Sequence, residues 1–201
     1  MAKKGMKTST KWLIGIGVLI LVLILWWVGI YNALIRLSES VDEGWAQVEN
    51  QYQRRADLIP NLIATVEGAR DFEAETQAQI AELRTQATQI KQAVGSGGLN
   101  PATLNELGGQ MDSVISGLNI VVEAYPDLKA TENFLALQSQ LEGTENRVAT
   151  ERKRFNTLVR EFNIKIKRIP SKWVASYLGY EEKDFFEADE GSEIVPTVDF
   201  S

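Results

Sequence analysis

Two pairs of carboxylates, Glu73 with Glu75 and Glu142 with Glu145, are the residues whose types and spacing could support acid–base or metal chemistry in a helical protein. Helical bundles that hold metal ions with carboxylates add histidine ligands, and this chain contains neither histidine nor cysteine. The composition therefore excludes a thiol nucleophile, a thiolate or imidazole zinc site and a Ser-His-Asp triad. Since glutamine, threonine and alanine surround these acids, we interpret them as solvated helix faces and expect no catalytic residue, no bound metal and no cofactor.

Residues 151–168 form the most basic stretch, with seven Lys and Arg against two acids. Aromatic residues interleave with them, a pattern also seen in nucleic-acid binding, but the net charge of −6 argues against a nucleic-acid partner. If this helix returns toward a membrane, its last basic residues reach anionic headgroups and the aromatics beyond it enter the interface. The alternative is a plain solvated face. We predict membrane-surface contact by Lys165, Lys167, Arg168, Trp173 and Tyr177.

An apolar stretch without any charge, WLIGIGVLILVLILWWVGI, occupies residues 12–30. Its 19 residues nearly match the thickness of the hydrocarbon core of a bilayer, so we predict a single transmembrane helix. A buried core helix is the alternative. A cleaved signal peptide does not fit, because bulky residues occupy the region where a cleavage site would need small ones. The residues expected to anchor the span at the two interfaces are Lys11, Trp12, Trp26 and Trp27.

Charge is distributed unevenly on the two sides of this span. Lys3, Lys4, Lys7 and Lys11 precede it, and residues 1–30 contain no acid. Positive charge stays in the cytoplasm, so we expect residues 1–11 to be a basic cytoplasmic terminus, with residues 31–201 facing the periplasm or exterior. Residues 181–201 hold eight acids against one lysine. We expect residues 187–201 to form an acidic, flexible tail.

Beyond the span, apolar residues recur at helical spacing in four stretches. The first continues directly from the span to Tyr52, and the second, which is coiled-coil-like, runs from Leu62 to Val94 with polar breaks at Glu73 and Thr76. The third runs from Leu104 to Val121 and the fourth from Phe134 to Ile169. Between the second and the third lies GSGGLNP at 95–101, where Asn100 is the expected N-cap and Pro101 the first helical residue.

No window requires a strand, so the sequence predicts an all-α fold. The transmembrane helix continues into an antiparallel bundle of about four long helices at residues 31–186. Residues 171–186, SKWVASYLGYEEKDFF, are expected to lie as an apolar strap over one end of the bundle.

The segment QYQRRADLIPNLIATV at 51–66 places a proline within a helical apolar pattern. A proline inside a helix costs about 3 kcal/mol, whereas one in the first turn costs little. We therefore favour a reversal, in which Arg54 and Arg55 end one helix, Asp57 caps the next and Pro60 lies in its first turn. A kinked but continuous first helix in a long helical hairpin is the alternative, because the apolar stripe keeps its phase through Val66.

The arginines of this segment need partners. If the turns at Pro60 and Pro126 lie at the same end of the bundle, Arg54 and Arg55 meet Asp127 or Glu132. A second expectation concerns two acids on apolar stripes, Glu73 and Glu145, for which Arg54, Arg55 or Arg152 is the expected partner.

The segments YNALIRL, VDEGWAQVENQYQRRADLIPNLIATVEG, YPDLKATENFLALQSQLEGTENRVATERKRFN and FNIKIKRIPSKWVASYLGY resemble the LemA family over about residues 30–187. Glu67-Gly68-Ala69 departs from the aromatic and basic residues more usual there. The resemblance implies a bacterial inner-membrane protein with one N-terminal anchor, a helical domain and no established enzymatic activity. It also implies an association with proteins of envelope quality control. One branch of the family, found in magnetosomes, is linked to membrane remodelling. The residues of the family motifs to which we assign a structural role are Arg54, Arg55, Asp57, Pro60, Asn61, Tyr125 and Pro126.

These patterns favour a non-enzymatic, membrane-anchored helical scaffold or interaction protein of the cell envelope that associates with itself. Membrane lipid, further copies of the chain and other envelope membrane proteins are the expected partners. One alternative is a membrane-shaping oligomer. Another is a hydrolase that uses serine or carboxylates in a bundle crevice, although the chain lacks a G-x-S-x-G motif.

Overall fold

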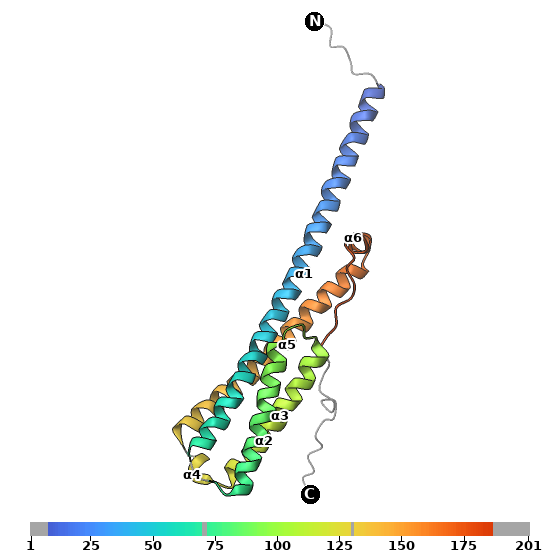
Figure 1. Cartoon of the computed structure of the whole chain (residues 1–201). Helices are drawn as coiled ribbons and strands as arrows, with labels where there is room; N and C mark the ends of the chain where they lie inside the picture. The colour runs from blue at the N-terminus through green and yellow to red at the C-terminus, as the bar shows by residue number, and fades with distance from the viewer. Residues whose placement is uncertain (1–7, 70–71, 130, 187–201) are drawn as a thin grey trace, which may run out of the picture. The chain divides into compact units, whose positions relative to one another are not determined.

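The structure is a computed structural model that describes residues 8–69, 72–129 and 131–186. Within these residues all regular elements are helical and no strand occurs, which confirms the all-α prediction. The helices are α1 (Thr8–Ala69), α2 (Ala74–Gly95), α3 (Pro101–Glu123), α4 (Pro126–Lys129), α5 (Glu132–Lys167) and α6 (Ser171–Leu178) (Figure 1). The expected acidic tail at 187–201 and residues 1–7 of the expected basic terminus lie outside the described residues.

The chain forms two compact units, which α1 and α5 both enter. The first, which we call the anchor unit, comprises Met1–Asp42 and Leu158–Lys183. The second, the bundle unit, comprises Glu43–Thr157 and Asp184–Ser201.

The bundle unit is built from the second part of α1, from α2, α3 and α4, and from the first part of α5. Helices α2 and α3 contact each other as a hairpin, drawn in green in Figure 1. Ion pairs join α2 to α1, with Lys91 Nζ 2.9 Å from Asp57 Oδ1 and Arg84 Nη1 2.9 Å from Glu67 Oε2. On α5, the ring of Phe155 lies 5.4 Å from that of Trp45 on α1, measured between centroids. These contacts place helices from distant parts of the sequence around one apolar interior.

The predicted reversal at Pro60 is wrong, because Pro60 lies inside α1, which continues to Ala69. Proline removes one backbone donor, but the apolar stripe on both sides of it is buried in the bundle unit, at Ala56, Ile59, Leu62, Ile63 and Val66. Each large apolar side chain buried in this way contributes about 1.5–3 kcal/mol, which together exceeds the cost of the proline. Asp57 is not an N-cap: its carboxylate pairs with Lys91 of α2.

The second predicted stripe, Leu62 to Val94, is not one helix. Helix α1 ends at Ala69 and α2 begins at Ala74, after Glu73, whose backbone is extended (φ −61°, ψ 154°). The break falls beside the polar positions that interrupt the stripe. Within α2 the buried residues are Ile80, Ala87, Ile90 and Val94.

The glycine-rich connection between α2 and α3 is confirmed. Gly97 and Gly98 adopt left-handed backbone conformations (φ +70° and +69°) that a side chain would disfavour. The side chain of Asn100 accepts a hydrogen bond of 2.8 Å from the backbone N–H of Thr103, and Pro101 begins α3. Cap and proline together supply the start signal that the sequence indicated.

The predicted strap at 171–186 has two parts. Residues 171–178 form α6, and residues 180–186 form a non-helical segment, which we call the strap. Two asparagines of α5 hold the strap by its backbone. Asn163 is hydrogen-bonded to Lys183 in the anchor unit, and Asn156 is hydrogen-bonded to Phe186 in the bundle unit, where the Phe186 ring stacks on Trp45.

Candidate functional site: a membrane-facing surface

The first part of α1 presents an apolar surface that no described residue covers. Residues 11–29 are exposed throughout, including the predicted anchors Lys11, Trp12, Trp26 and Trp27. Among the residues that the structure describes, one helix, α1, is long and apolar enough to cross a membrane. Burial begins only beyond this stretch, where the buried side chains of the anchor unit come from three helices: Leu34 and Val41 on α1, Val159, Phe162 and Ile166 on α5, and Val174 and Ala175 on α6.

Helix α6 has one buried face and one exposed aromatic face. Val174 and Ala175 are almost fully buried. Trp173 and Tyr177, one helical turn apart, are 59% and 76% exposed, and Ile169 in the turn before α6 is also exposed. An amphipathic helix with aromatic residues on its outer face is typical of segments that lie in a membrane interface.

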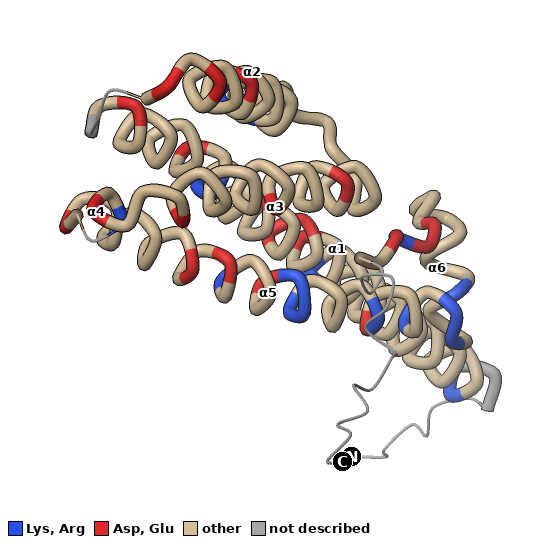
Figure 2. Tube along the Cα trace, turned by 90° about the horizontal axis from the view of Figure 1, so that it is seen from below, with Lys and Arg blue, Asp and Glu red and all other residues tan. Residues whose placement is uncertain are grey.

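The predicted basic residues lie at the end of α5, close to α6. Figure 2 shows Lys and Arg gathered along the end of α5 and the adjoining start of α6. Arg168 and Lys172 are exposed and Lys165 is half-buried. Lys167 is also exposed, but its Nζ lies 2.7 Å from Glu182 Oε2, so part of its charge is neutralised. Lys172 is not among the predicted residues, because it follows Pro170 and lies outside the basic stretch at 151–168.

Contacts within the anchor unit place α6 close to the end of the apolar stretch of α1. Lys183 on the strap pairs with Asp42, at 2.6 Å between Nζ and Oδ1. Asp42 lies about 18 Å beyond Ile30 along the helix axis. Helix α5 runs back alongside α1 in Figure 1 and continues about 6 Å from Asn163, the partner of Lys183, to its end. Helix α6 therefore begins on the order of 12 Å from the end of the apolar stretch, measured along the axis of α1.

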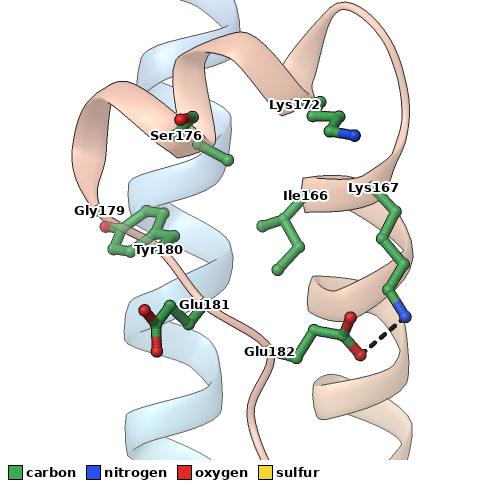
Figure 3. Close-up of a pocket in the computed structure, with 9 residues that line it drawn as sticks. Ile166, Lys167, Lys172, Ser176, Gly179, Tyr180, Glu181 and Glu182 are labelled. Atoms are coloured by element: carbon green, nitrogen blue, oxygen red, sulfur yellow. Dashed lines mark ion pairs between the residues drawn. The ribbon is translucent and has the colours of Figure 1, made fainter.

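A pocket of about 650 Å³ lies beside α6 in the anchor unit (Figure 3). Lys172 and Ser176 of α6, Ile166 and Lys167 of α5, and Tyr180, Glu181 and Glu182 of the strap line it. The ring of Phe162 lies 5.5 Å from that of Tyr180, measured between centroids. Two lysines and two glutamates give the pocket a formal charge near zero.

The predicted motif residues of the bundle unit are dispersed over its core and surface. Arg55 is buried and forms an ion pair with Asp112 of α3, which corrects the expected pairing with Asp127 or Glu132. Arg54 is exposed. Tyr125 packs edge-on against Phe72, with 5.0 Å between the ring centroids. Asn61 accepts a hydrogen bond from Thr65 through its backbone carbonyl, and Pro126 begins α4.

A second cavity, of about 520 Å³, brings Arg55 and Asp112 together with Asn105, Glu145 and Arg152 in the bundle unit. Arg152 donates a hydrogen bond of 2.8 Å to Asn105 Oδ1, and its guanidinium also lies over the ring of Phe186. Glu145 shares this cavity with Arg55 and Arg152, two of the three arginines expected as its partners. The sequence does not predict Asp112 as the partner of Arg55, because only the packing of α3 against α1 brings the two residues together.

The carboxylates of both pairs are exposed. Glu73 precedes α2, Glu75 lies in the first turn of α2, and Glu142 and Glu145 lie on α5. Glu142 Oε1 accepts a hydrogen bond of 3.2 Å from Gln138. In the part of the chain that the structure describes, no group of three or more carboxylates is positioned to hold a metal ion.

The chain is similar to several proteins of known family. Protein LemA of Metamycoplasma hominis is 26% identical over 82% of this chain and 72% of its own length. Magnetosome protein MamQ 2 of Paramagnetospirillum magneticum and Magnetosome protein MamQ of Magnetospirillum gryphiswaldense are each 23% identical over 78% of this chain, which spans 64% of their length. The LemA family model matches residues 44–200, and the chain therefore belongs to the LemA family.

Proposed function

We propose that this protein is a non-enzymatic, membrane-anchored helical interaction protein of the bacterial cell envelope. In this proposal α1 crosses the inner membrane once, and α6 lies on the surface of the same bilayer. The bundle unit presents its helices to partners. The observation that carries the proposal is the uncovered apolar surface at residues 11–29.

The size of this surface favours a bilayer over water. Fifteen large apolar side chains between Trp12 and Val28 are exposed. Burying one such side chain contributes about 1.5–3 kcal/mol, so the sum exceeds the total stability of about 5–15 kcal/mol typical of a protein domain. A bilayer removes this surface from water without any protein partner.

Helix α6 adds a second contact with the membrane. The ring systems of Trp173 and Tyr177 suit the headgroup layer, where one edge is apolar and the other wet. Lys165, Arg168 and Lys172 each add about 1 kcal/mol if they approach an anionic surface. Lys167 adds less because Glu182 already pairs with it. The segment would hold the end of α5 at a fixed height above the bilayer.

The lysines before the span favour an N-terminus in the cytoplasm and a bundle unit in the periplasm or exterior. Because the chain has no cysteine, single cysteines can be introduced to test this topology. A membrane-impermeant maleimide added to intact spheroplasts should label Ser139→Cys, at an exposed position of α5, and leave Ala2→Cys unlabelled until the cells are lysed. The reverse labelling would show the opposite orientation. Labelling of neither site before lysis would contradict the proposed exposure of the bundle unit.

Extraction tests the anchor itself. The full chain should stay with the membrane pellet after alkaline carbonate treatment, because the apolar segment is inserted rather than adsorbed. Replacing Leu19, Leu21 and Leu23 with Lys should release it, while replacing exposed Gln86, Gln89 and Gln92 of α2 with Lys should not. Recovery of the unaltered full chain in the soluble fraction would contradict the proposal.

We further propose that the interaction surfaces include contacts between copies of this chain. Ile120 on α3 and Leu135 on α5 are large apolar side chains exposed on the bundle unit. They are candidates for such contacts, together with the exposed apolar surface of α1. Light scattering of the detergent-solubilised full chain should give a mass above that of one copy, and a monomeric mass would contradict self-association.

A further inference from the structure

We propose that the pocket beside α6, defined above, binds a phospholipid headgroup that carries both a phosphate and a primary ammonium group, as an aminoethyl phosphate ester does. This inference rests on the proposed position of α6 at the bilayer surface. It goes further by naming the lipid class that this segment selects.

The pocket contains one ion pair and two charged side chains outside any ion pair in the described part of the chain. Lys167 and Glu182 neutralise each other across 2.7 Å. Lys172 and Glu181, which also line the pocket, have no ion-pair partner among the described residues. The pocket therefore offers one cation and one anion that no side chain of the described part neutralises. A ligand with an anion and a cation on a short linker would pair with both.

The order of these charges matches the orientation of a lipid. Lys172 belongs to α6, whereas Glu181 and Glu182 lie on the strap, further from α6 in Figure 3. With α6 in the headgroup layer, as proposed above, groups beside it are near the depth of the phosphates. The ammonium of such a lipid extends further toward water, where the glutamates are. Ser176 and Tyr180 supply hydroxyl donors on the pocket wall for phosphate oxygens.

The same chemistry discriminates between lipids. A primary ammonium donates up to three hydrogen bonds to carboxylates, and a choline ammonium donates none. An anionic headgroup such as phosphoglycerol offers no cation to Glu181 and would meet like charge at the strap. The neutral pocket should therefore prefer phosphatidylethanolamine to both phosphatidylcholine and phosphatidylglycerol.

Native mass spectrometry of the full chain in detergent, with the three lipids at equal concentration and with identical acyl chains, tests this preference. We expect phosphatidylethanolamine to be retained about tenfold more than either competitor, the factor that corresponds to one hydrogen bond to a charged group. Glu181→Gln should reduce this preference about tenfold, whereas Lys172→Gln should reduce the retention of all three lipids about tenfold, because each of them carries a phosphate. The matched controls are Glu123→Gln and Lys153→Gln, which change exposed charges of the bundle unit and should leave both retention and preference unaltered.

Equal retention of the three lipids, or equal effects of pocket and control variants, would overturn the inference. Thermal unfolding of each variant identifies any that fails to fold, and Lys172→Arg, which keeps the charge, should retain the lipids as the unaltered chain does. Titration of the full chain in phosphatidylcholine nanodiscs with O-phosphoethanolamine distinguishes the source of the headgroup. Binding of this soluble compound as tight as that of the lipid would assign the pocket to a free metabolite and overturn the lipid assignment.

One further measurement separates failure of the lipid assignment from failure of the proposed membrane position of α6. A spin label at Tyr177→Cys in the same nanodiscs reports whether α6 contacts the bilayer. Contact without lipid preference overturns only the pocket assignment, whereas absence of contact overturns the membrane position of α6 on which it rests.

Discussion

The side-chain amide of Asn163 is hydrogen-bonded twice to the backbone of Lys183. Asn163 Nδ2 donates to the carbonyl oxygen of Lys183 at 2.9 Å, and the backbone N–H of Lys183 donates to Asn163 Oδ1 at 3.0 Å. The asparagine thus satisfies both backbone groups of a residue that has no neighbouring strand. This double hydrogen bond holds the strap against α5, and the strap carries the carboxylates that line the pocket beside α6.

Replacing Asn163 with Ala should release the strap around Lys183. Two hydrogen bonds are lost, and each is worth about 0.5–1.5 kcal/mol, so the free energy of local opening should fall by about 1–3 kcal/mol. Amide hydrogen exchange at Lys183 measures this directly. The control is Asn146→Ala, at an exposed position of the same helix. Unchanged protection of Lys183 in Asn163→Ala would show that the amide contacts do not hold the strap.

The Arg55–Asp112 pair should respond unequally to removal of its two members. The Arg55 side chain is 5% exposed and that of Asp112 is 59% exposed. Asp112→Ala leaves a buried guanidinium without its counter-ion, which we expect to cost about 2–3 kcal/mol. Arg55→Met leaves a carboxylate that water can solvate and fills most of the same volume, so about 1 kcal/mol or less should be lost. Urea unfolding of both variants in detergent measures the difference.

A larger loss for Arg55→Met than for Asp112→Ala would contradict this order. A matched control for the removal of an aspartate is Asp57→Ala, since Asp57 and its partner Lys91 are both half-exposed. Exposed pairs of this kind contribute about 0–1 kcal/mol.

Pro60→Ala should stabilise the protein. Because α1 continues through this position, alanine restores a backbone donor and removes the clash of the proline ring, a gain of up to about 3 kcal/mol. If the chain reversed at Pro60 instead, the same substitution would be neutral or destabilising. The urea midpoint in detergent distinguishes the two outcomes, and Pro101→Ala, at the start of α3, is the control that should gain no such stability.

Local signals were sufficient to predict much of the fold. The start of α3 depends on Asn100 and Pro101, which act within a few residues of each other. The continuation of the apolar span into the first helix depends on unbroken helical spacing, which α1 confirms. Both features are decided by residues close together in the sequence.

The sequence prediction for Pro60 is wrong because it counts the local cost of a proline but not the burial of the surrounding apolar side chains. The cost of the proline is a property of the segment itself, whereas the burial that exceeds it depends on α2, α3 and α5. The partner of Arg55 likewise depends on tertiary packing. Asp112 is 57 positions away, and no spacing rule connects the two residues.

The candidate site was predictable in part. The types of these residues, basic at the end of α5 and aromatic at Trp173 and Tyr177, are sufficient to predict them as candidates for membrane contact. Their separation from the buried Val174 and Ala175 depends on α6 being a helix, which the interpretation of 171–186 as a single strap did not anticipate. The role of Asn163 could not be predicted from the sequence, because a single asparagine within a helix does not indicate which distant segment it contacts.

Trp173→Ser combined with Tyr177→Ser should weaken membrane contact without weakening the fold, because both side chains are exposed. Hydrogen exchange of α6 in nanodiscs should increase, while the thermal midpoint in detergent stays unchanged. Val174→Ser, by contrast, places a hydroxyl in a fully buried position and should lower stability by about 2 kcal/mol or more in either medium. Equal exchange of α6 in the double variant and the unaltered chain would contradict membrane contact.

The depth of three positions in a bilayer tests the membrane account most directly. Spin labels at Val22→Cys on α1, Tyr177→Cys on α6 and Ser139→Cys in the bundle unit can be compared by the accessibility of each label to oxygen and to a water-soluble nickel complex. We predict that the first label lies in the hydrocarbon core, the second at headgroup depth and the third in water. Access of the nickel complex to the Val22→Cys label equal to that at Ser139→Cys would contradict the central claim that α1 crosses the membrane.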